Sequence, residues 1–258
     1  MSHYLTLSLM TERWPIAGTF AISRGAKTEA VVVVAELAEG SFKGRGECVP
    51  YARYGESVAS VTAAIEAIRL RLAAGLTRQA LQSAMPAGAA RNAVDCALWD
   101  LEAKRSGKRA YELAGLPTPQ PLTTAFTISI AAPAAMAKAA AAASGRALLK
   151  VKLGGNAEDG GDAARIAAVR AAAPKATLIV DANEGWTEDN LAGHLAACAQ
   201  AGVVLVEQPC RKARTRRWPP SSAQSRSAPT RAFMTAVHFP GSKANTTPST
   251  SSSTRPAA

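Results

Sequence analysis

The second half of this 258-residue chain alternates strand-like and helix-like segments at a nearly constant interval, and this repeat limits the possible folds most. Thr127, Lys152, Asp181 and Glu207 mark equivalent places in four apolar segments, and they are 25, 29 and 26 residues apart. Parallel strands need long crossover connections, so a period of this length predicts a parallel sheet with helices between the strands. The sequence therefore predicts an α/β architecture, either a barrel or an open sheet.

Strands and helices can be assigned in this half from pattern alone. The predicted strands are TTAFTISI, ALLKVKLGG, ATLIVDANEG and GVVLVEQP, which span 123–130, 147–155, 176–185 and 202–209. The predicted helices between them are the alanine-rich run 133–143, then 162–173 and 187–200. About four strands of a (β/α) TIM-type barrel are recognisable.

The first half has a different pattern, with strands first and helices after them. EAVVVVAELAEG and the segment after it predict strands, and the run from Ser57 to Ala74 predicts a helix with Ser57 as its N-cap. Thr77 is expected to open a short helix, and Gly107 to end a long one. We therefore predict an α+β domain over 1–118, a half-barrel over 119–209 and a separate tail over 210–258.

The tail carries most of the net charge of +11. Every Asp and Glu lies at or before Glu207, whereas nine of the 30 Lys and Arg residues lie in 211–258. The tail is rich in Ser, Thr, Pro and Arg and shows no periodicity, so it is expected to be disordered. Five of the seven residues in 211–217 are basic and Trp218 could stack on a base, which leaves nucleic-acid binding as a remote alternative. Without a folded module in the tail, we expect no nucleic-acid partner.

Simple counts predict the cellular location of the protein and the redox state of its cysteines. No apolar run reaches the ~18 residues needed to cross a bilayer, and the N-terminus lacks the features of a secretory signal. The four cysteines have no CxxC spacing, which argues against a zinc site and for reduced thiols. Cys96 and Cys198 are expected in helix cores. We predict a cytoplasmic protein with no membrane partner.

Charged residues gather at the predicted C-terminal strand ends, where barrel enzymes place their active sites. Lys150 and Lys152 are two residues apart, so they point to the same face of their strand. Asp181 and Glu207 end the next two strands, so their carboxylates should converge. Converging carboxylates suit a hard cation such as Mg²⁺.

Each of these residues also has a structural explanation. A Lys-x-Lys pair is often solvated, an Asp after a parallel strand often caps the next helix, and Glu207 could simply end its strand. The lysine pair, Asp181 and Glu207 all lie at equivalent ends of successive strands. This shared position favours a functional site over three separate coincidences.

The residues resemble a known family. Lys-x-Lys, Asp-Ala-Asn and Glu-Gln-Pro on successive strands resemble the enolase superfamily, in its muconate-lactonizing-enzyme branch. GECVPYARYGES (46–57) and ARNAVDCALWDLEAKRSG (90–107) resemble dipeptide epimerases of the L-Ala-D/L-Glu type, and TAFTISI (124–130) is similar to their first barrel strand. The resemblance covers residues 1–209.

The resemblance implies an architecture and a cofactor. The N-terminal domain would cap the barrel mouth. Its loops around Arg24 and around Tyr51–Tyr54 would close over a small dipeptide, with Arg24 and Tyr54 contacting it. Asp181 and Glu207 correspond to the first two of three magnesium ligands, which implies Mg²⁺. Members of the family are often homo-oligomers.

It also implies roles for four further side chains. Lys152 corresponds to the base that removes the proton α to a carboxylate, giving an enediolate. Lys150 corresponds to the neighbour that contacts the substrate carboxylate, and its like charge helps to keep Lys152 uncharged. Thr127 corresponds to a substrate contact, and Asn183 is expected to support the site. A cycloisomerase, an o-succinylbenzoate synthase-like dehydratase and an epimerase of another dipeptide share this base and metal pattern and remain alternatives.

Two family motifs are missing from the sequence. The third metal ligand belongs to an Ala-Asp-Glu-Ser stretch on the fifth strand, and a second lysine to an Asn-Ile-Lys-like stretch on the sixth. Neither occurs, so the chain is expected to be truncated. With the later strands missing, we expect an unpaired edge on the fourth strand and aggregation. With two carboxylates in place of three metal ligands, we expect weak magnesium binding. We also expect little or no epimerisation, because no lysine serves the opposite face of the substrate.

A change of reading frame after Pro209 would explain the tail. With suitable codons, residues 227–232 read from the last base of each codon give Cys-Ala-Asp-Glu-Ser, and 249–255 give Asn-Ile-Lys-Leu-Asp-Lys. Both missing motifs occur in one frame and in the family's order. We interpret the tail as the product of a single-base deletion.

The gene sequence tests this interpretation. The nucleotides after the codon for Pro209, read in the shifted frame, should encode further barrel strands that contain acidic residues. A shifted frame without such strands would exclude the deletion.

Overall fold

The computed structural model describes residues 4–155 and 160–210, together with the strand 236–238. It divides into two units, described separately below. The first comprises Met1–Gly18 and Lys27–Pro121, and the second Thr19–Ala26 and Leu122–Ala258. Most of the predicted disordered tail, 211–235 and 239–258, lies outside the described residues.

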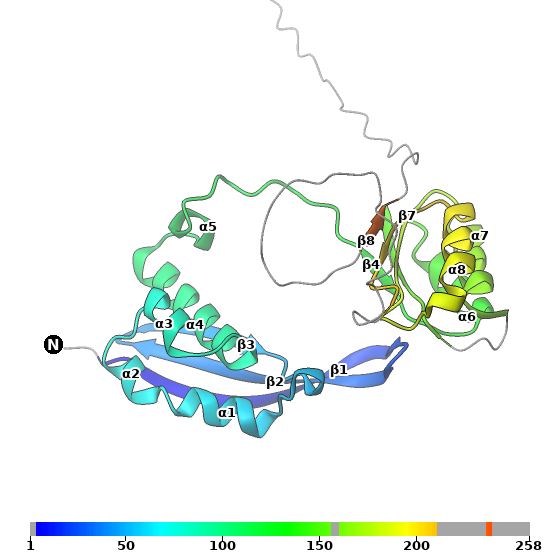
Figure 1. The fold of residues 1–258 in the computed structure, drawn as a ribbon. Coiled ribbons are helices and arrows are strands. Elements are labelled where there is room, and N and C mark those ends of the chain that lie inside the picture. Colours follow the sequence, from blue (N-terminus) through cyan, green and yellow to red (C-terminus); the bar gives the residue numbers. More distant parts are fainter. Residues whose placement is uncertain (1–3, 156–159, 211–235, 239–258) are drawn as a thin grey trace, which may run out of the picture. The chain divides into compact units, whose positions relative to one another are not determined.

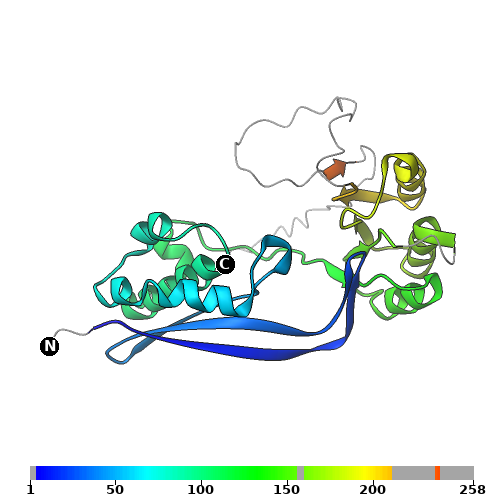
Figure 2. The ribbon, with the colours of Figure 1, turned by 60° about the horizontal axis from the view of Figure 1, so that its bottom comes forward.

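The first unit contains a three-stranded sheet in the order β1-β2-β3, apart from the tip of the β1–β2 hairpin, Thr19–Ala26, which belongs to the second unit (Figures 1 and 2). Its strands are β1 (Thr6–Ile22), β2 (Gly25–Glu39) and β3 (Phe42–Cys48). β2 and β3 are antiparallel, with Glu39 opposite Phe42 and Val33 opposite Cys48. Gly40 at their turn has a φ of 58°, a conformation that suits glycine.

Helices follow the strands, as the sequence predicts. They are η1 (Ala52–Tyr54), α1 (Val58–Glu66), α2 (Arg69–Ala73), α3 (Arg78–Ala84), α4 (Ala89–Ser106) and α5 (Ala110–Leu113). Ser57 caps α1 in a capping box with Ser60, and Thr77 accepts a hydrogen bond from the N–H of Ala80 at the start of α3. Gly107 ends α4 in the left-handed conformation. The predicted caps are therefore confirmed.

Two glycines allow α4 to lie directly on β3. A Cβ at Gly44 would come within 2.2 Å of the Ala97 oxygen, and a Cβ at Gly46 within 2.0 Å of the Ala93 oxygen. Because the two glycines are two residues apart, they share one face of the strand. The sequence G-R-G therefore sets how closely helix and sheet approach.

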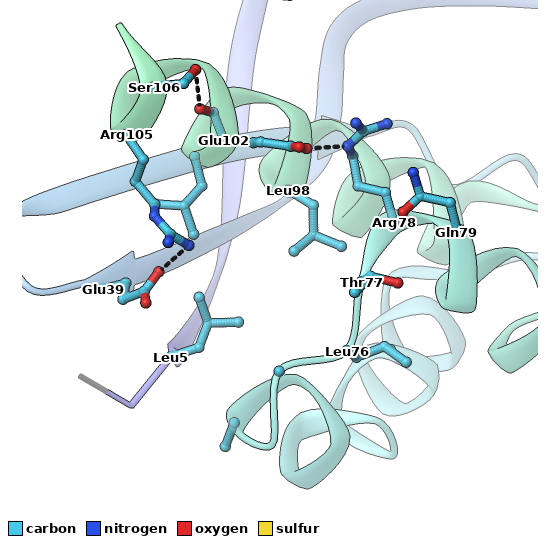
Figure 3. A pocket seen from close by; sticks show the side chains of 13 residues that line it. Leu5, Glu39, Leu76, Thr77, Arg78, Gln79, Leu98, Glu102, Arg105 and Ser106 are labelled. Carbon is cyan, nitrogen blue, oxygen red and sulfur yellow. Dashed lines mark hydrogen bonds and ion pairs between the residues drawn. The ribbon is translucent and has the colours of Figure 1, made fainter. Parts of the chain in front are cut away.

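A cavity of about 520 Å³ lies beside the C-terminal half of α4 (Figure 3). Apolar residues such as Leu76 and Leu98 line it, and two ion pairs flank it, Arg78 with Glu102 at 2.5 Å and Arg105 with Glu39 at 2.6 Å. None of the predicted site residues lines this cavity.

The second unit contains a five-stranded sheet in the order β4-β5-β6-β7-β8. β4 to β7 are parallel and β8 is antiparallel to β7. The strands are β4 (Phe126–Ile128), β5 (Leu148–Lys152), β6 (Thr177–Asp181), β7 (Val203–Glu207) and β8 (Ala236–His238). The helices α6 (Pro133–Ala142), α7 (Gly161–Ala172) and α8 (Glu188–Gln200) lie on one side of it (Figure 1). The predicted half-barrel pattern is confirmed.

The strands present a different side-chain chemistry on each face. Leu149, Val151, Leu178 and Val180 are fully buried in a core shared with the helices. Their sequence neighbours on β5 and β6 therefore point to the opposite face, and these include both lysines and Asp181. This opposite face carries the charged groups.

Four expectations need correction. The single helix expected from Ser57 to Ala74 is divided into α1 and α2. The edge of β7 is paired over Leu205–Glu207, because β8 binds there. β4 is shorter than predicted, since only Phe126–Ile128 pair with β5. Cys96 is exposed on α4, whereas Cys198 is buried as expected.

In the described part of the chain, no helix has the length and apolarity that crossing a membrane requires.

The glycine contact predicts a sensitive position. Gly46→Ala should lower the free energy of unfolding by about 1–3 kcal/mol, because its methyl group meets the backbone of α4. Gly193→Ala, in the open on α8, is the control and should cause no loss. Thermal unfolding followed by circular dichroism measures both, and an unchanged midpoint for Gly46→Ala would contradict the packing described.

Candidate active site

The strand ends bring the predicted site residues into two adjacent rows. Lys152 pairs in register with Asp181, and Asp181 with Glu207, so these three form one row across β5, β6 and β7. Thr127 pairs with Lys150, which lies two residues before Lys152 on β5. Because residues paired in register on parallel strands share a face, all five side chains belong to the face opposite the helices.

A one-residue shift of register creates this row. Leu178 pairs with Val203, whereas Ile179 pairs with Leu205. Without the shift, Asp181 would lie beside Val206, which is buried on the other face. The irregularity therefore places the two carboxylates next to each other.

The four charges of the site neutralise one another. The Lys150 Nζ lies 2.5 Å from Glu207 Oε2 and 3.2 Å from Asp181 Oδ2. The Lys152 Nζ lies 2.7 Å from the same Asp181 oxygen. Two ammonium groups thus meet two carboxylates, and the ammonium of Lys150 bridges them.

Burial makes these ion pairs important for stability, because a buried charge without a partner is costly. Lys152 is 7% exposed and Asp181 2%, so neither is a solvated surface charge. Burial alone would lower the pKa of Lys150, but hydrogen bonds and attraction from Glu207 and Asp181 raise it above its ordinary value. Burial alone would raise the pKa of Asp181, yet hydrogen bonds from Lys152 and the Asn183 N–H lower it. The two carboxylates therefore hold Lys150 in its charged form.

The loop after β6 is held in an unusual conformation. Asn183 and Glu184 have φ values of 48° and 63°, and Gln208 after β7 has 46°; these are the residues other than glycine with positive φ in the described chain. The Asn183 N–H donates to Asp181 Oδ1 at 2.9 Å. Such conformations persist only where their surroundings enforce them, and they often mark functional sites.

The tip of the β1–β2 hairpin contacts this loop within the second unit. Arg24 Nη1 donates a hydrogen bond to the Asn183 carbonyl, and Ser23 Oγ donates to the same oxygen at 3.2 Å. Phe20 presents its ring to Lys152, with 5.8 Å between Nζ and the ring centroid. Arg24 thus lies close to the row, as expected. Phe20 and Ser23 could not be predicted, since nothing local in the sequence marks them.

Tyr54 belongs to the first unit. Its side chain is 75% exposed in η1, and its ring lies 5.6 Å from that of Tyr51. The expected contact with substrate stays a prediction.

The arrangement excludes two of the structural explanations. Thr187, not Asp181, is the N-cap of α8, and Lys152 is not solvated. Glu207 does end β7, but its carboxylate also binds Lys150.

The donors present fit a hard divalent cation in part. Asp181 and Glu207 offer adjacent carboxylates, and the ammonium of Lys150 bridges them. The space between these carboxylates therefore favours a positive charge. The Asn183 Oδ1 is a buried oxygen with no hydrogen-bond partner in the described part of the chain. Mg²⁺ is commonly held by one or two carboxylates with water completing the shell. Within 4–155 and 160–210, no three His, Cys, Asp or Glu side chains gather as a metal cluster.

The pairing predicts unequal costs for removing its members. Asp181→Asn should lower the free energy of unfolding by about 3–5 kcal/mol, because Lys152 loses its ion-pair partner while buried. Lys152→Met should cost at most about 2 kcal/mol, since Asp181 keeps Lys150. Urea denaturation measures both, and equal losses would contradict the pairing.

Family models match both parts of the chain. Residues 4–115 match the mandelate racemase / muconate lactonizing enzyme N-terminal domain, and 132–219 match the enolase C-terminal domain-like family.

Individual relatives agree with these matches. The chain is 48% identical over 206 residues to the L-Ala-D/L-Glu epimerase of Escherichia coli K12, covering 79% of this chain and 63% of that protein. It is 42% identical over 183 residues to an N-acetyl-D-glutamate racemase of a Pseudoalteromonas species, covering 69% of this chain and 56% of the relative. The chain thus spans less than two thirds of the length of these relatives.

Solved structures share the fold. An enolase family member from Agrobacterium tumefaciens with homology to dipeptide epimerases, which holds sodium and L-Ala-L-Glu, gives a TM-score of 0.76 at 55% identity. The alignment covers 81% of this chain and 63% of that one. The dipeptide epimerase of Cytophaga hutchinsonii, solved with Mg and D-Ala-L-Val, gives 0.72 at 28% identity, covering 81% and 60%. The chain belongs to the enolase superfamily, in the mandelate racemase and muconate lactonizing enzyme group that includes the dipeptide epimerases.

Proposed function

We propose that this chain carries the first half of the site of a magnesium-dependent dipeptide epimerase of the L-Ala-D/L-Glu type. Its chemistry is removal of the proton α to the substrate's carboxylate. The observation that carries the proposal is the row of Lys152, Asp181 and Glu207 across three strand ends, with Lys150 beside it.

Lys152 is the base in this proposal. Its Nζ is buried, lies at the strand end and contacts Asp181 Oδ2, so a substrate Cα placed there meets an amine shielded from water. A lysine acts as a base only after its ammonium has lost a proton, so its contact with Asp181 must loosen first.

Asp181 and Glu207 would hold Mg²⁺. When bound, the ion supplies positive charge that stabilises the negative charge developing on the substrate carboxylate. A cation between these carboxylates also competes with the ammonium groups of Lys150 and Lys152 for the same oxygens.

The remaining residues bind and orient the dipeptide. Lys150 stays protonated because of its raised pKa, and it attracts the substrate carboxylate. Thr127 lies beside Lys150 in register and offers a hydroxyl. Arg24 supports the Asn183 carbonyl from the hairpin tip and keeps further N–H groups for the ligand. Tyr54 is the aromatic residue that we assign to the capping loop.

The relatives support the substrate class. The E. coli relative is named for L-Ala-D/L-Glu, and the A. tumefaciens structure holds L-Ala-L-Glu. Both share about half of their aligned residues with this chain. The cytoplasmic location, the homo-oligomeric state and the lack of nucleic-acid and membrane partners stay predictions.

Among the described residues, both lysines of the site come from β5, which predicts exchange without inversion. In D₂O with Mg²⁺, the α-proton of the glutamate in L-Ala-L-Glu should slowly exchange for deuterium, while L-Ala-D-Glu does not accumulate. Lys152→Ala should slow the exchange by about 100-fold or more, because the base is lost. Proton NMR measures both the exchange and the epimer.

Lys138→Ala is the matched control, since Lys138 is an exposed lysine on α6 of the same unit. It should leave exchange unchanged. Exchange that is equally fast in Lys152→Ala would disprove the role of Lys152, and rapid accumulation of the epimer would disprove the one-sided site.

A further inference from the structure

A second buried ion pair lies in the first two turns of α7, apart from the charged row. Asp162 Oδ1 and Arg165 Nη1 are 2.9 Å apart, and the two residues are 3% and 4% exposed. The proposed chemistry uses neither residue. Buried charges are expensive to desolvate, so their position calls for an explanation.

The second oxygen of Asp162 joins two loops. Asp162 Oδ2 accepts a hydrogen bond from the Gly154 N–H at 2.7 Å and another from the Trp186 Nε1–H at 2.7 Å. Gly154 is two residues after Lys152, and Trp186 is five residues after Asp181. One carboxylate oxygen therefore ties the chain just after β5 to the chain just after β6.

Arg165 extends the link to a third loop. Its Nε donates to the Ala131 carbonyl at 3.0 Å, in the loop after β4. The ion pair thus contacts the segments that leave three consecutive strands. Thr127, Lys152 and Asp181 lie at or close to the ends of these same strands.

The loops have no room to shift against each other. A Cβ at Gly154 would lie 2.2 Å from the Ala182 oxygen, and a Cβ at Gly185 would lie 2.4 Å from the Gly154 oxygen. The Leu153 N–H also donates to the Asp181 carbonyl at 3.0 Å. Movement at the ion pair would therefore be passed to Lys152 and Asp181.

We propose that Asp162 and Arg165 are positioning residues that hold the strand ends so that Lys152 and Asp181 keep their relative geometry. Through Asp181 they set the affinity of the carboxylate pair for a divalent cation. The cation part of this inference rests on the proposed function, whereas the bracing of the loops does not. Groups that orient metal ligands from behind commonly change metal affinity by about 10–100-fold when they are altered.

Mn²⁺ binding to the full chain, followed by electron paramagnetic resonance, tests the cation part. Asp162→Asn keeps the side-chain shape but loses the charge and one accepting oxygen, and it should weaken Mn²⁺ binding by about 10–100-fold. Trp186→Phe keeps an aromatic ring and removes one donor to Asp162, so it should weaken binding less.

Two controls separate positioning from stability. Asp189→Asn makes the same substitution at an exposed acid in the first turn of α8 and should leave the Mn²⁺ affinity and thermal midpoint unchanged. Val169→Ala removes buried methyl groups from α7, so it should lower the thermal midpoint and leave the Mn²⁺ affinity unchanged. An Asp162→Asn affinity equal to that of the unsubstituted chain would overturn the inference.

Hydrogen exchange read by mass spectrometry tests the bracing without any cation. Asp162→Asn should speed deuterium uptake in peptides covering 153–155 and 182–187, beyond any rise in Val169→Ala. Unchanged uptake in these peptides would overturn the inference. A chain that binds no Mn²⁺ yet shows this local rise would reject the proposed function and retain the bracing.

Discussion

Mutual neutralisation of charges at the ends of β5, β6 and β7 is the constraint on which the second unit depends. Lys150 and Lys152 share the carboxylates of Asp181 and Glu207, and burial makes an unpartnered member of this set costly. The apolar core on the other face attaches the helices to the sheet, but apolar side chains tolerate many alignments. The charges tolerate few, because each must meet its partner on a neighbouring strand. The same groups that suit the chemistry therefore also help to fix the register of the sheet.

Much of this architecture could be predicted from the sequence. The strand-helix period predicts a parallel sheet, and the two-residue spacing of Lys150 and Lys152 predicts their common face. The register shift at β7 could not be predicted, because the uniform apolar run V-V-L-V carries no periodic signal. The contacts of Asp162 could not be predicted either. An acid in the first turn of a helix is ordinary, and the partners of Asp162 come from two separate loops as well as from its own helix.

The loop after β6 shows how several weak restraints maintain a costly backbone. Asn183 and Glu184 lie in the left-handed region, which Asn tolerates but which is unfavourable for Glu. The Asn183 N–H binds the carboxylate of Asp181, while its carbonyl receives Ser23 and Arg24 from the hairpin tip. The Glu184 N–H binds the Gln208 carbonyl at 2.7 Å, and the Trp186 N–H binds the Pro209 carbonyl at 3.0 Å. Conformations of this kind persist because the surrounding contacts leave the backbone no alternative.

The assignment of Thr19–Ala26 to the second unit has a consequence for dissecting the protein. Ala21 accepts a hydrogen bond from the Ile130 N–H through its carbonyl and donates one to Ser129 Oγ through its amide. A fragment that starts at the linker near Pro121 would lack these eight residues and expose the backbone groups that they satisfy. Autonomous expression of the strand-helix half would therefore require a circularly permuted gene, or the missing peptide supplied in trans.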